Sequence, residues 1–315
     1  MEGASTVQPQ PRRLSTPLIA GLLAACAMSF AVVAEAQETI SVEDARGTQE
    51  VPLKPQTVVV FDMASLDTLG ALGVEVAGVP QVVLPDYLQL FAEVEKVGSL
   101  FEPDLEAVNA LQPDLIIVGG RSGPKAEALS AIAPTLDMTV DQQNFVASAE
   151  KNVKTLATVF GKEAQADAAL EKLDASIEAL HAKAGEAGNA LIVLTTGNKM
   201  SAYGKGSRFG VLHDAFGFEP ADPNLAVANH GEAISFEYIA KTNPDWLFVI
   251  DRDAAIGRGA AAAMLDNELV GGTSAWKDGQ VVYLTPANWY LIGGGLQAMQ
   301  QNVDQITQAL DKSGQ

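Results

Sequence analysis

One pattern occurs twice in this sequence, as LEAVNALQPDLIIVGGR from Leu105 to Arg121 and as FEYIAKTNPDWLFVIDR from Phe236 to Arg252. The two copies align without a gap. Each has the pattern of an amphipathic helix with a glutamate in its first turn, followed by a Pro-Asp turn and a short, continuously apolar strand. Continuously apolar strands that alternate with helices are typical of parallel sheets buried on both faces. The repeat therefore predicts an α/β protein of two related, Rossmann-like lobes.

Each copy of the repeat ends in an arginine, Arg121 in the first copy and Arg252 in the second. In open α/β sheets, ligands bind beyond the carboxyl ends of the strands, and both arginines fall at such a position. Two lobes that each present a cation at their strand ends predict a cleft between the lobes that binds an anion.

The N-terminal segment, residues 1–36, has the features of a secretory signal peptide. Arg12 and Arg13 precede an apolar stretch from Leu18 to Phe30, and Ala34-Glu35-Ala36 has the small-x-small pattern of signal-peptidase cleavage. We therefore exclude this segment from the fold and expect a periplasmic protein whose mature chain begins at Gln37.

Cys26 is the only cysteine of the chain, and it permits a second interpretation. It ends the segment Leu23-Ala24-Ala25-Cys26, which also fits a lipoprotein-type box. Acylation there would leave an apolar mature terminus, where lipoproteins usually carry a polar tether, so we favour cleavage after Ala36 over lipoprotein anchoring at Cys26. A mature chain without cysteine excludes disulfides, thiolate metal sites and cysteine nucleophiles.

The chain is strongly acidic, with 39 Asp and Glu against 20 Lys and Arg and a net charge of −19. The signal peptide contains two charges of each sign (Glu2, Glu35, Arg12 and Arg13), so its removal leaves this net charge unchanged. Such a surface repels nucleic acid and anionic membranes. No later segment has the roughly 18 consecutive apolar residues that span a bilayer. We expect a soluble, exported monomer in which an anionic ligand requires a local basic patch.

We divide the mature chain into an N-terminal lobe (37–145), a connecting helix (146–186) and a C-terminal lobe (187–315). Apolar residues spaced three and four apart predict one long, rigid helix from Val146 to Lys183, which would act as a stiff hinge. The other expected elements are strands over 57–61, 115–118, 190–195 and 281–284, and helices from an N-cap at Ser65 to Leu72, over 122–132 and over 295–310.

A third arginine, Arg208, lies in the glycine-rich segment SAYGKGSRFG, residues 201–210. Glycines around a strand-to-helix loop let backbone and side chain approach a ligand closely. A single arginine is most often part of a surface salt bridge. Three arginines in strand-end loops of so acidic a chain indicate an anion site, because guanidinium is permanently charged and binds planar pairs of oxygen atoms.

The chain contains three histidines, and two of them, His181 and His213, are expected to be structural or solvated. His230 lies in a loop just before the second repeat helix, and Tyr290 follows the last expected strand. The simplest interpretations are a surface histidine and an amphipathic aromatic residue at a lobe rim. A phenolate and an imidazole could instead complete the coordination of Fe(III), which prefers anionic oxygen and accepts imidazole nitrogen.

Four segments resemble the periplasmic siderophore-binding proteins of ABC importers, in the branch that binds ferric catecholates and related siderophores. These segments are FDMASLDTL (61–69), SAYGKGSRFG (201–210), NHG (229–231) and WY (289–290). The similarity extends from about Ile40 to the end and is strongest in the second lobe. It implies a class III solute-binding protein that binds Fe(III) only as a siderophore complex, without an intrinsic cofactor, and delivers it to an inner-membrane ABC permease.

The resemblance also implies roles for individual residues. In the family, three arginines form a basic floor under the ferric complex, a histidine and a tyrosine fill iron positions that a tetradentate siderophore leaves vacant, and one acidic residue per lobe docks the permease. The floor corresponds here to Arg121, Arg208 and Arg252, the iron ligands to His230 and Tyr290, further ligand contacts to Tyr203 and Trp289, and the docking residues to Glu106 and Glu237. The sequence departs from the family at Met63-Ala64, where relatives often have a glycine; this puts in doubt which ligand backbone fits.

Several alternatives remain at this point. A haem- or corrinoid-binding protein of the same fold is the first, because such haem proteins also use tyrosine and histidine as ligands, but three arginines favour a ligand with delocalised negative charge. Zinc or manganese capture needs clustered His and carboxylate ligands, and only His230 is well placed. A periplasmic hydrolase needs a nucleophile beside a base, and the sequence has no Gly-x-Ser-x-Gly elbow. We therefore expect a binding protein and not an enzyme.

Overall fold

The computed structural model describes residues 1–6, 8, 37–259 and 261–313. Residues 37–315 form one compact unit, which contains both lobes and the connection between them. The apolar stretch Leu18–Phe30, Cys26 and the cleavage motif Ala34–Ala36 of the predicted signal peptide lie outside the described residues. Within the described residues, no helix combines the length and the apolar character needed to cross a membrane.

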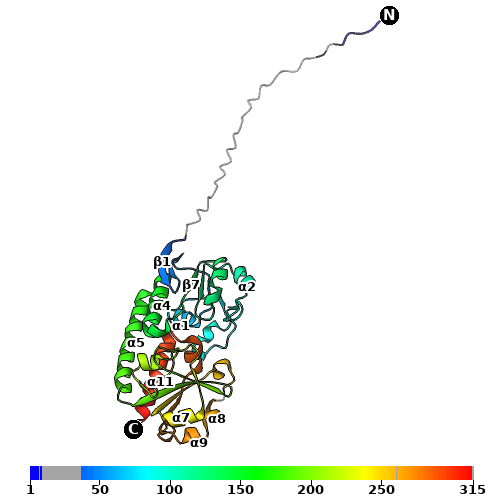
Figure 1. The fold of residues 1–315 in the computed structure, drawn as a ribbon. Coiled ribbons are helices and arrows are strands. Elements are labelled where there is room, and N and C mark those ends of the chain that lie inside the picture. Colours follow the sequence, from blue (N-terminus) through cyan, green and yellow to red (C-terminus); the bar gives the residue numbers. More distant parts are fainter. Residues whose placement is uncertain (7, 9–36, 260, 314–315) are drawn as a thin grey trace. The chain divides into compact units, whose positions relative to one another are not determined.

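The first lobe is built on a five-stranded, all-parallel sheet in the order β5-β4-β3-β6-β7 (Figure 1). Every residue of its central strands β3 and β6 is fully buried, which explains why these strands are continuously apolar. An antiparallel hairpin, β1 with β2, precedes the sheet. The elements are β1 Thr39–Asp44, β2 Gly47–Pro52, β3 Val58–Val60, α1 Met63–Ala71, β4 Gly78–Val79, η1 Asp86–Phe91, β5 Glu95–Lys96, α2 Leu105–Ala110, β6 Leu115–Val118, η2 Gly123–Lys125, α3 Ala126–Ser130 and β7 Thr135–Asp137.

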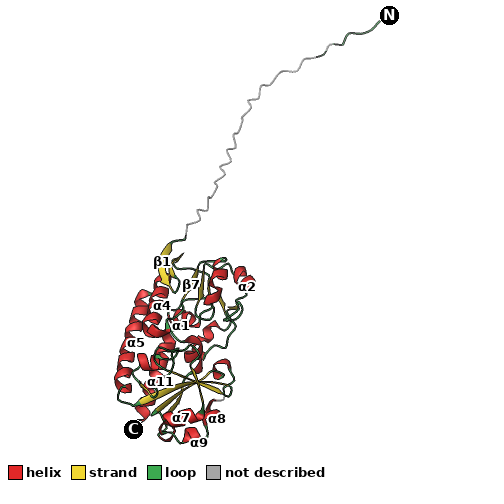
Figure 2. Cartoon of the chain, in the orientation of Figure 1, coloured by secondary structure: helices red, strands yellow, loops and turns green. Residues whose placement is uncertain are grey.

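The second lobe is built on a sheet in the order β11-β9-β8-β12-β13, with helices beside both sheets (Figure 2). Strands β8, β12 and β13 run parallel, as in the first lobe, whereas β9 and β11 extend the sheet in antiparallel fashion. The elements are β8 Asn189–Thr196, β9 Lys199–Tyr203, α6 Val211–Asp214, β10 Glu219–Pro220, β11 Glu232–Ile234, α7 Phe236–Thr242, β12 Trp246–Asp251, η4 Ala254–Ile256, α8 Ala261–Leu265, α9 Glu268–Gly271, α10 Ser274–Lys277, β13 Val281–Tyr283, η5 Ala287–Ile292 and α11 Leu296–Ser313.

The internal repeat is confirmed as two equivalent helix–turn–strand units, α2 with β6 and α7 with β12. Gln112 and Asn243, which occupy the same place in the two copies, both adopt a left-handed backbone, with φ of 47° and 45°. The aspartates of the two Pro-Asp turns also act alike. The Asp114 carboxylate accepts hydrogen bonds from the backbone ahead of β3, and the Asp245 carboxylate accepts one from Asn189 at the start of β8. Each repeat thus ties its turn to the neighbouring strand.

The connection between the lobes is helical, as expected, but it is not one helix. Helix α4 (Phe145–Phe160) ends at Gly161, and α5 (Glu163–Ala184) begins two residues later (Figure 1). Gly161 has φ 64° and its N–H donates to the carbonyl of Ala157, which is a left-handed helix cap that favours glycine. The apolar spacing continues across this break because both helices bury their apolar faces in the same core, so periodicity alone did not reveal it.

Two smaller expectations are corrected. The N-cap of α1 is Asp62 and not Ser65: the Asp62 carboxylate accepts from the Ser65 backbone N–H at 2.8 Å and from its hydroxyl at 2.7 Å. The expected helix over 122–132 is a 3-10 turn followed by the short helix α3.

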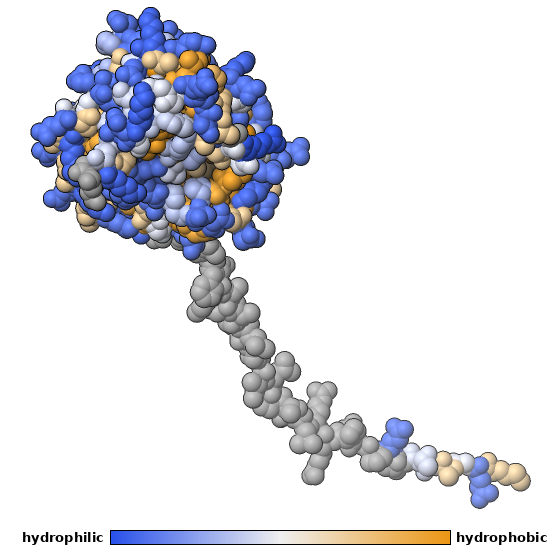
Figure 3. All heavy atoms as spheres, turned by 90° about the horizontal axis from the view of Figure 1, so that it is seen from below, coloured by the Kyte–Doolittle hydropathy of each residue, from blue (hydrophilic) through white to orange (hydrophobic). Residues whose placement is uncertain are grey.

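Several acidic side chains lie on the outside of the compact unit, for example Glu163, Glu171 and Glu178 on α5. The face seen in Figure 3 is covered largely by hydrophilic side chains, with separate, smaller apolar areas between them.

Candidate functional site

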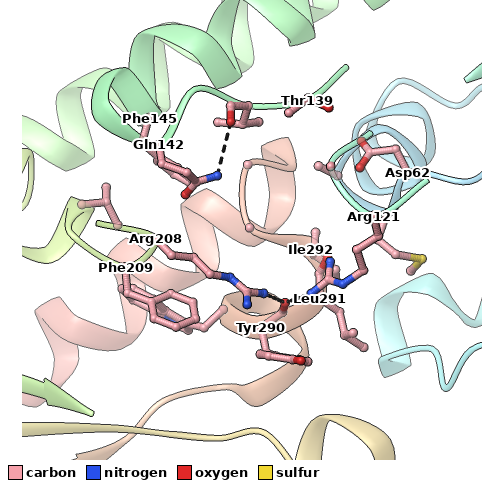
Figure 4. A pocket seen from close by; sticks show the side chains of 18 of the residues that line it. Asp62, Arg121, Thr139, Gln142, Phe145, Arg208, Phe209, Tyr290, Leu291 and Ile292 are labelled. Carbon is pink, nitrogen blue, oxygen red and sulfur yellow. Dashed lines mark hydrogen bonds between the residues drawn. The ribbon is translucent and has the colours of Figure 1, made fainter. Parts of the chain in front are cut away.

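A cavity of about 360 Å³ lies between the two lobes. The first lobe lines it with the ends of β3, β6 and β7 and with the start of α4, and the second lobe lines it with the loop after β9 and the segment from η5 to α11 (Figure 4). Its polar lining includes Asp62, Arg121, Thr139, Gln142, Arg208, Asn229 and Tyr290, and its apolar lining includes Met63, Met138, Phe145, Phe209, Phe216, Trp289 and Met299. The ligand space is therefore basic in one part and apolar or aromatic in another.

Tyr290 lies on η5, a wide π-helical turn, and its backbone carbonyl accepts hydrogen bonds from two arginines. Arg208 donates to this carbonyl at 2.7 Å and Arg121 donates to the same oxygen atom; Arg121 also donates to the carbonyl of Leu291 at 3.1 Å. In Figure 4 the two guanidinium groups approach Tyr290 from opposite sides. Because Arg121 belongs to the first lobe, these bonds join the lobes at the floor of the cavity.

All three predicted arginines surround the ring of Tyr290. The guanidinium carbons of Arg208, Arg121 and Arg252 lie 4.7, 5.3 and 5.6 Å from the ring centroid. Arg252 Nε also donates to the Tyr290 hydroxyl at 2.9 Å. Arg252 does not line the cavity, and its connection to the site is its contact with the Tyr290 side chain. The structure thus brings the arginines together, two of them on the cavity wall and the third behind the tyrosine.

The local charge makes this cluster receptive to an anion. Within the described residues, neither Arg121 nor Arg208 forms an ion pair with a carboxylate. Burial and then the neighbouring charge of Arg208 lower the pKa of Arg121. Burial alone would raise the pKa of Tyr290, but the hydrogen bond from Arg252 and the charges of the three arginines bring it below its ordinary value. An anion placed here would relieve the repulsion between like charges.

The loops that carry the arginines are held by short-range contacts. Gly119 lies so close to Asp62 that a Cβ atom on it would come within 2.3 Å of the carboxylate, so only glycine allows this approach. Ser122 Oγ then accepts from the Gly119 N–H at 3.1 Å and closes the turn that presents Arg121. In the second lobe, Asp214 accepts from the Gly206 N–H at 2.7 Å and fixes the loop of Arg208.

The remaining predicted ligand residues divide into two groups. Trp289 lines the cavity, in edge-to-face contact with Phe216. His230 is exposed on a turn and does not line the cavity, although its neighbour Asn229 does. Tyr203 is only 1 % exposed, packs edge-on against Phe209 and is not part of the cavity lining, so its role as a direct ligand contact stays a prediction.

The two predicted docking residues, Glu106 and Glu237, are exposed in the first turns of α2 and α7. Each helix precedes a parallel strand, so its first turn lies at the sheet edge where the strands end. This is the edge that carries Arg121 in one lobe and Arg252 in the other.

One half-buried carboxylate of the cavity wall, that of Asp62, was not predicted as a site residue. Asp62 lies two residues after the end of β3, so the rule that selected the arginines, position at a strand end, could also have selected it. Most of the apolar part of the wall was missed as well, apart from Trp289. Met138, Phe145, Phe216 and Met299 come from four separate segments outside the quoted motifs, whereas Met63 lies in the motif FDMASLDTL.

Asp62 leads to a prediction about stability and pH. Burial raises its pKa from the ordinary value of 3.8 to about 6, although hydrogen bonds from Ser65 oppose this. A carboxyl whose pKa is raised by folding destabilises the folded state progressively as pH rises from about 4 to about 6. We expect the free energy of unfolding in urea to fall by about 2 to 3 kcal/mol less in Asp62→Asn than in the wild type over this pH range, at about 1.4 kcal/mol per pKa unit. The wild-type fall also contains the contribution of Asp67, whose pKa burial raises to about 7. Asp86→Asn, at an exposed aspartate, is the control; equal slopes in both variants would contradict the assignment.

The comparisons with known proteins agree with this geometry. Residues 58–287 match the family described as periplasmic binding protein. The chain is 42 % identical over 275 residues to the petrobactin-binding protein YclQ of Bacillus subtilis (strain 168), covering 85 % of this chain and 86 % of the relative. It is 30 % identical over 285 residues to the ferric-anguibactin-binding protein FatB of Vibrio anguillarum, covering 87 % and 88 %.

Solved structures give the same result for the fold. The crystal structure of YclQ superposes with a TM-score of 0.85 at 41 % identity, covering 87 % of this chain and 99 % of that one. The periplasmic catecholate-siderophore binding protein VctP from Vibrio cholerae superposes with a TM-score of 0.82 at 33 % identity, covering 86 % and 100 %. This chain therefore belongs to the periplasmic binding protein family.

Proposed function

We propose that the protein binds a ferric siderophore of the catecholate type in the cleft between its lobes and delivers it to an ABC permease for iron uptake. The observation that carries this proposal is the cluster of Arg121, Arg208 and Arg252 around Tyr290. Ferric catecholate complexes carry negative charge on oxygen pairs, which guanidinium groups match in charge and in geometry. Relatives named for petrobactin, anguibactin and catecholate siderophores support the same ligand class.

The apolar part of the cavity fits the rest of such a ligand. Phe145, Phe209 and Trp289 offer aromatic faces and edges to catechol rings, while Met63 and Met138 are flexible enough to pack against a linker of variable shape.

For a tetradentate siderophore we propose that Tyr290 and His230 supply the two missing iron ligands. The lowered pKa of Tyr290 favours the phenolate that Fe(III) prefers. His230 lies one residue from Asn229 of the cavity wall, on an exposed turn, so a rearrangement of this loop would bring its ring to the ligand.

This coordination predicts a dependence on siderophore denticity. Tyr290→Phe and His230→Ala should weaken tetradentate ferric complexes about tenfold or more and leave hexadentate ones nearly unchanged, because six donors already saturate the metal. The tetradentate complex should also gain a visible tyrosinate-to-iron absorption band on binding, which Tyr290→Phe abolishes. Tyr283→Phe, at an exposed tyrosine, is the matched control. Equal losses for both ligand types would mean that the two residues only pack against the ligand.

We further propose that residues 1–36 direct export, that the mature protein works in the periplasm as a soluble monomer, and that Glu106 and Glu237 dock the permease. The paired position of the two glutamates on equivalent helices supports contact with a two-fold symmetric partner.

Tryptophan fluorescence provides the test of function, because Trp289 lines the cavity. We expect quenching with a sub-micromolar Kd for at least one ferric catecholate in a panel that also contains ferric citrate, haemin and cobalamin. Preference for haemin or cobalamin would replace the proposal by the haem or corrinoid alternative. Saturation by none of these ligands would reject iron-complex binding altogether.

A further inference from the structure

The last helix of the protein, α11, has no N-cap residue of its own. Helices need acceptors for their first N–H groups, and the preceding side chain usually provides one. Here the preceding residues are Gly293, Gly294 and Gly295, which have no side chains to offer. The acceptors come instead from α1 in the first lobe, more than 200 positions earlier in the chain.

Asp67 and Thr68 together satisfy the first three N–H groups of α11. Asp67 Oδ1 accepts from Gln297 N at 2.7 Å and Oδ2 from Ala298 N at 3.1 Å, while Thr68 Oγ1 accepts from Leu296 N at 3.3 Å. Gly295 is required for this contact, since a Cβ atom there would come within 2.6 Å of the Asp67 side chain. Both capping residues are buried, Asp67 completely.

The same carboxylate is linked to the binding segment. Tyr87 of the first lobe donates to Asp67 Oδ2 at 2.9 Å, and its hydroxyl lies 3.1 Å from Asn288 Oδ1 in η5. Asn288 is buried and donates from Nδ2 to Gln301 of α11 at 3.0 Å. The network therefore contacts η5 at Asn288 and the start of α11 at Gln297 and Ala298. Tyr290 lies between these two points in the sequence.

We propose that Asp67 is a positioning residue for the ligand site: by capping α11 across the lobe boundary, it holds the Tyr290 segment in register with Arg121 and limits how far the lobes can move apart. This inference rests on the proposed function for its binding readout, but the joint itself can be measured without any ligand. Opening the lobes at this point would leave the first turn of an 18-residue helix without acceptors, which is costly in a buried setting.

The neutral isostere, asparagine, should preserve part of the joint. Burial raises the pKa of Asp67 to about 7, against the opposing effect of hydrogen bonds from Gln297, Tyr87 and Ala298. Asparagine is a good N-cap acceptor, but it keeps only one of the two acceptor oxygens and replaces the other by an NH2 group, which cannot accept from a backbone N–H. Asp67→Asn is thus the conservative variant, whereas Asp67→Ala removes both acceptor atoms.

The test combines an interlobe distance with an affinity. Spin labels are attached at Asn109→Cys in α2 and Lys241→Cys in α7, both exposed positions, in a Cys26→Ser background, and double electron–electron resonance gives the distance distribution without ligand. We expect a narrow distribution in the otherwise unmodified protein, a broadened one in Asp67→Ala and an intermediate one in Asp67→Asn, which keeps one of the two acceptor oxygens. The Kd for the ferric siderophore should rise about five- to tenfold in Asp67→Ala, measured at low temperature where the variant is folded.

Asp104→Ala is the matched control, because Asp104 also accepts from two backbone N–H groups but caps its own helix within one lobe. Broadening and affinity loss in Asp67→Ala but not in Asp104→Ala support the proposal. A distribution like that of Asp104→Ala, or broadening without a change in Kd, overturns it. If Asp67→Ala fails to fold, Tyr87→Phe carries the same test, since it removes the hydroxyl between Asp67 and Asn288. If the unmodified protein binds no siderophore, the proposed function fails, and the distance distributions still decide whether Asp67 holds the joint.

Discussion

Replacement of Arg121 and Arg208 together by glutamine should weaken binding of an anionic ferric siderophore on the order of a thousandfold. Each guanidinium group can form charge-assisted hydrogen bonds to the ligand, worth about 1.5 to 3 kcal/mol, so each single replacement should cost about 10- to 150-fold in Kd. The two side chains share the carbonyl of Tyr290 and sense each other's charge, so the double variant is not expected to be strictly additive. Fluorescence titration of the two single variants and the double variant measures both effects.

Arg258→Gln is the control for this experiment. Arg258 is exposed, lies in the second lobe and does not line the cavity, so its replacement removes one positive charge without touching the site. We expect its Kd to stay within about twofold of the wild type, because exposed charges are screened. Circular dichroism verifies that all variants are folded. A double variant that binds as tightly as Arg258→Gln would remove the arginine cluster from the ligand site.

The sequence predicted the fold well where a whole segment is subject to the same requirement, such as burial of a strand on both faces. Strand β6 was predicted with its observed bounds, and β8 and β13 to within one residue at each end, because strands buried on both faces are apolar throughout. The division of the connecting helix at Gly161 was missed, because α4 and α5 bury their apolar faces in the same core and the spacing of apolar residues continues from one helix to the next. A single left-handed glycine changes the backbone direction without changing that spacing.

The candidate site was predictable in its charged part, and in its apolar part only at Trp289. Arg121 and Arg252 follow from the repeat and from the rule on strand ends, and the structure gathers them with Arg208 around Tyr290. Tyr203 was assigned to the ligand from a matching motif, yet the side chain is turned into the core beside Phe209. A motif identifies a loop, but it does not say which side chains of that loop face the cavity.

The capping of α11 by Asp67 shows the same limit for contacts between distant segments. The sequence shows a run of three glycines before the helix, which signals a missing cap, but it does not show which residue replaces it. The acceptor belongs to α1, and its position is set by the packing of α1 against α11 across the lobe boundary. Such partners follow from tertiary structure and not from local pattern.

Charge reversal of both proposed docking residues, Glu106→Lys with Glu237→Lys, should abolish siderophore-dependent iron uptake while leaving the Kd for the ferric siderophore unchanged. Both side chains are exposed outside the cavity, and two reversed charges would replace attraction to basic permease residues by repulsion. Reversal also places a cation in the first helical turn, which costs about 0.3 to 1 kcal/mol per helix and does not unfold the protein.

Uptake of radiolabelled iron, in cells that depend on this protein, measures the effect of the double reversal, and fluorescence titration measures the Kd in parallel. Glu171→Lys with Glu178→Lys on α5 is the control with the same change in net charge, because both residues are exposed on the helix that connects the lobes and lie away from the strand ends. Loss of uptake in the first pair but not in the second assigns docking to the two equivalent helix starts. Normal uptake in both pairs would leave Glu106 and Glu237 with only a local role, in which their negative charge stabilises the first turns of α2 and α7.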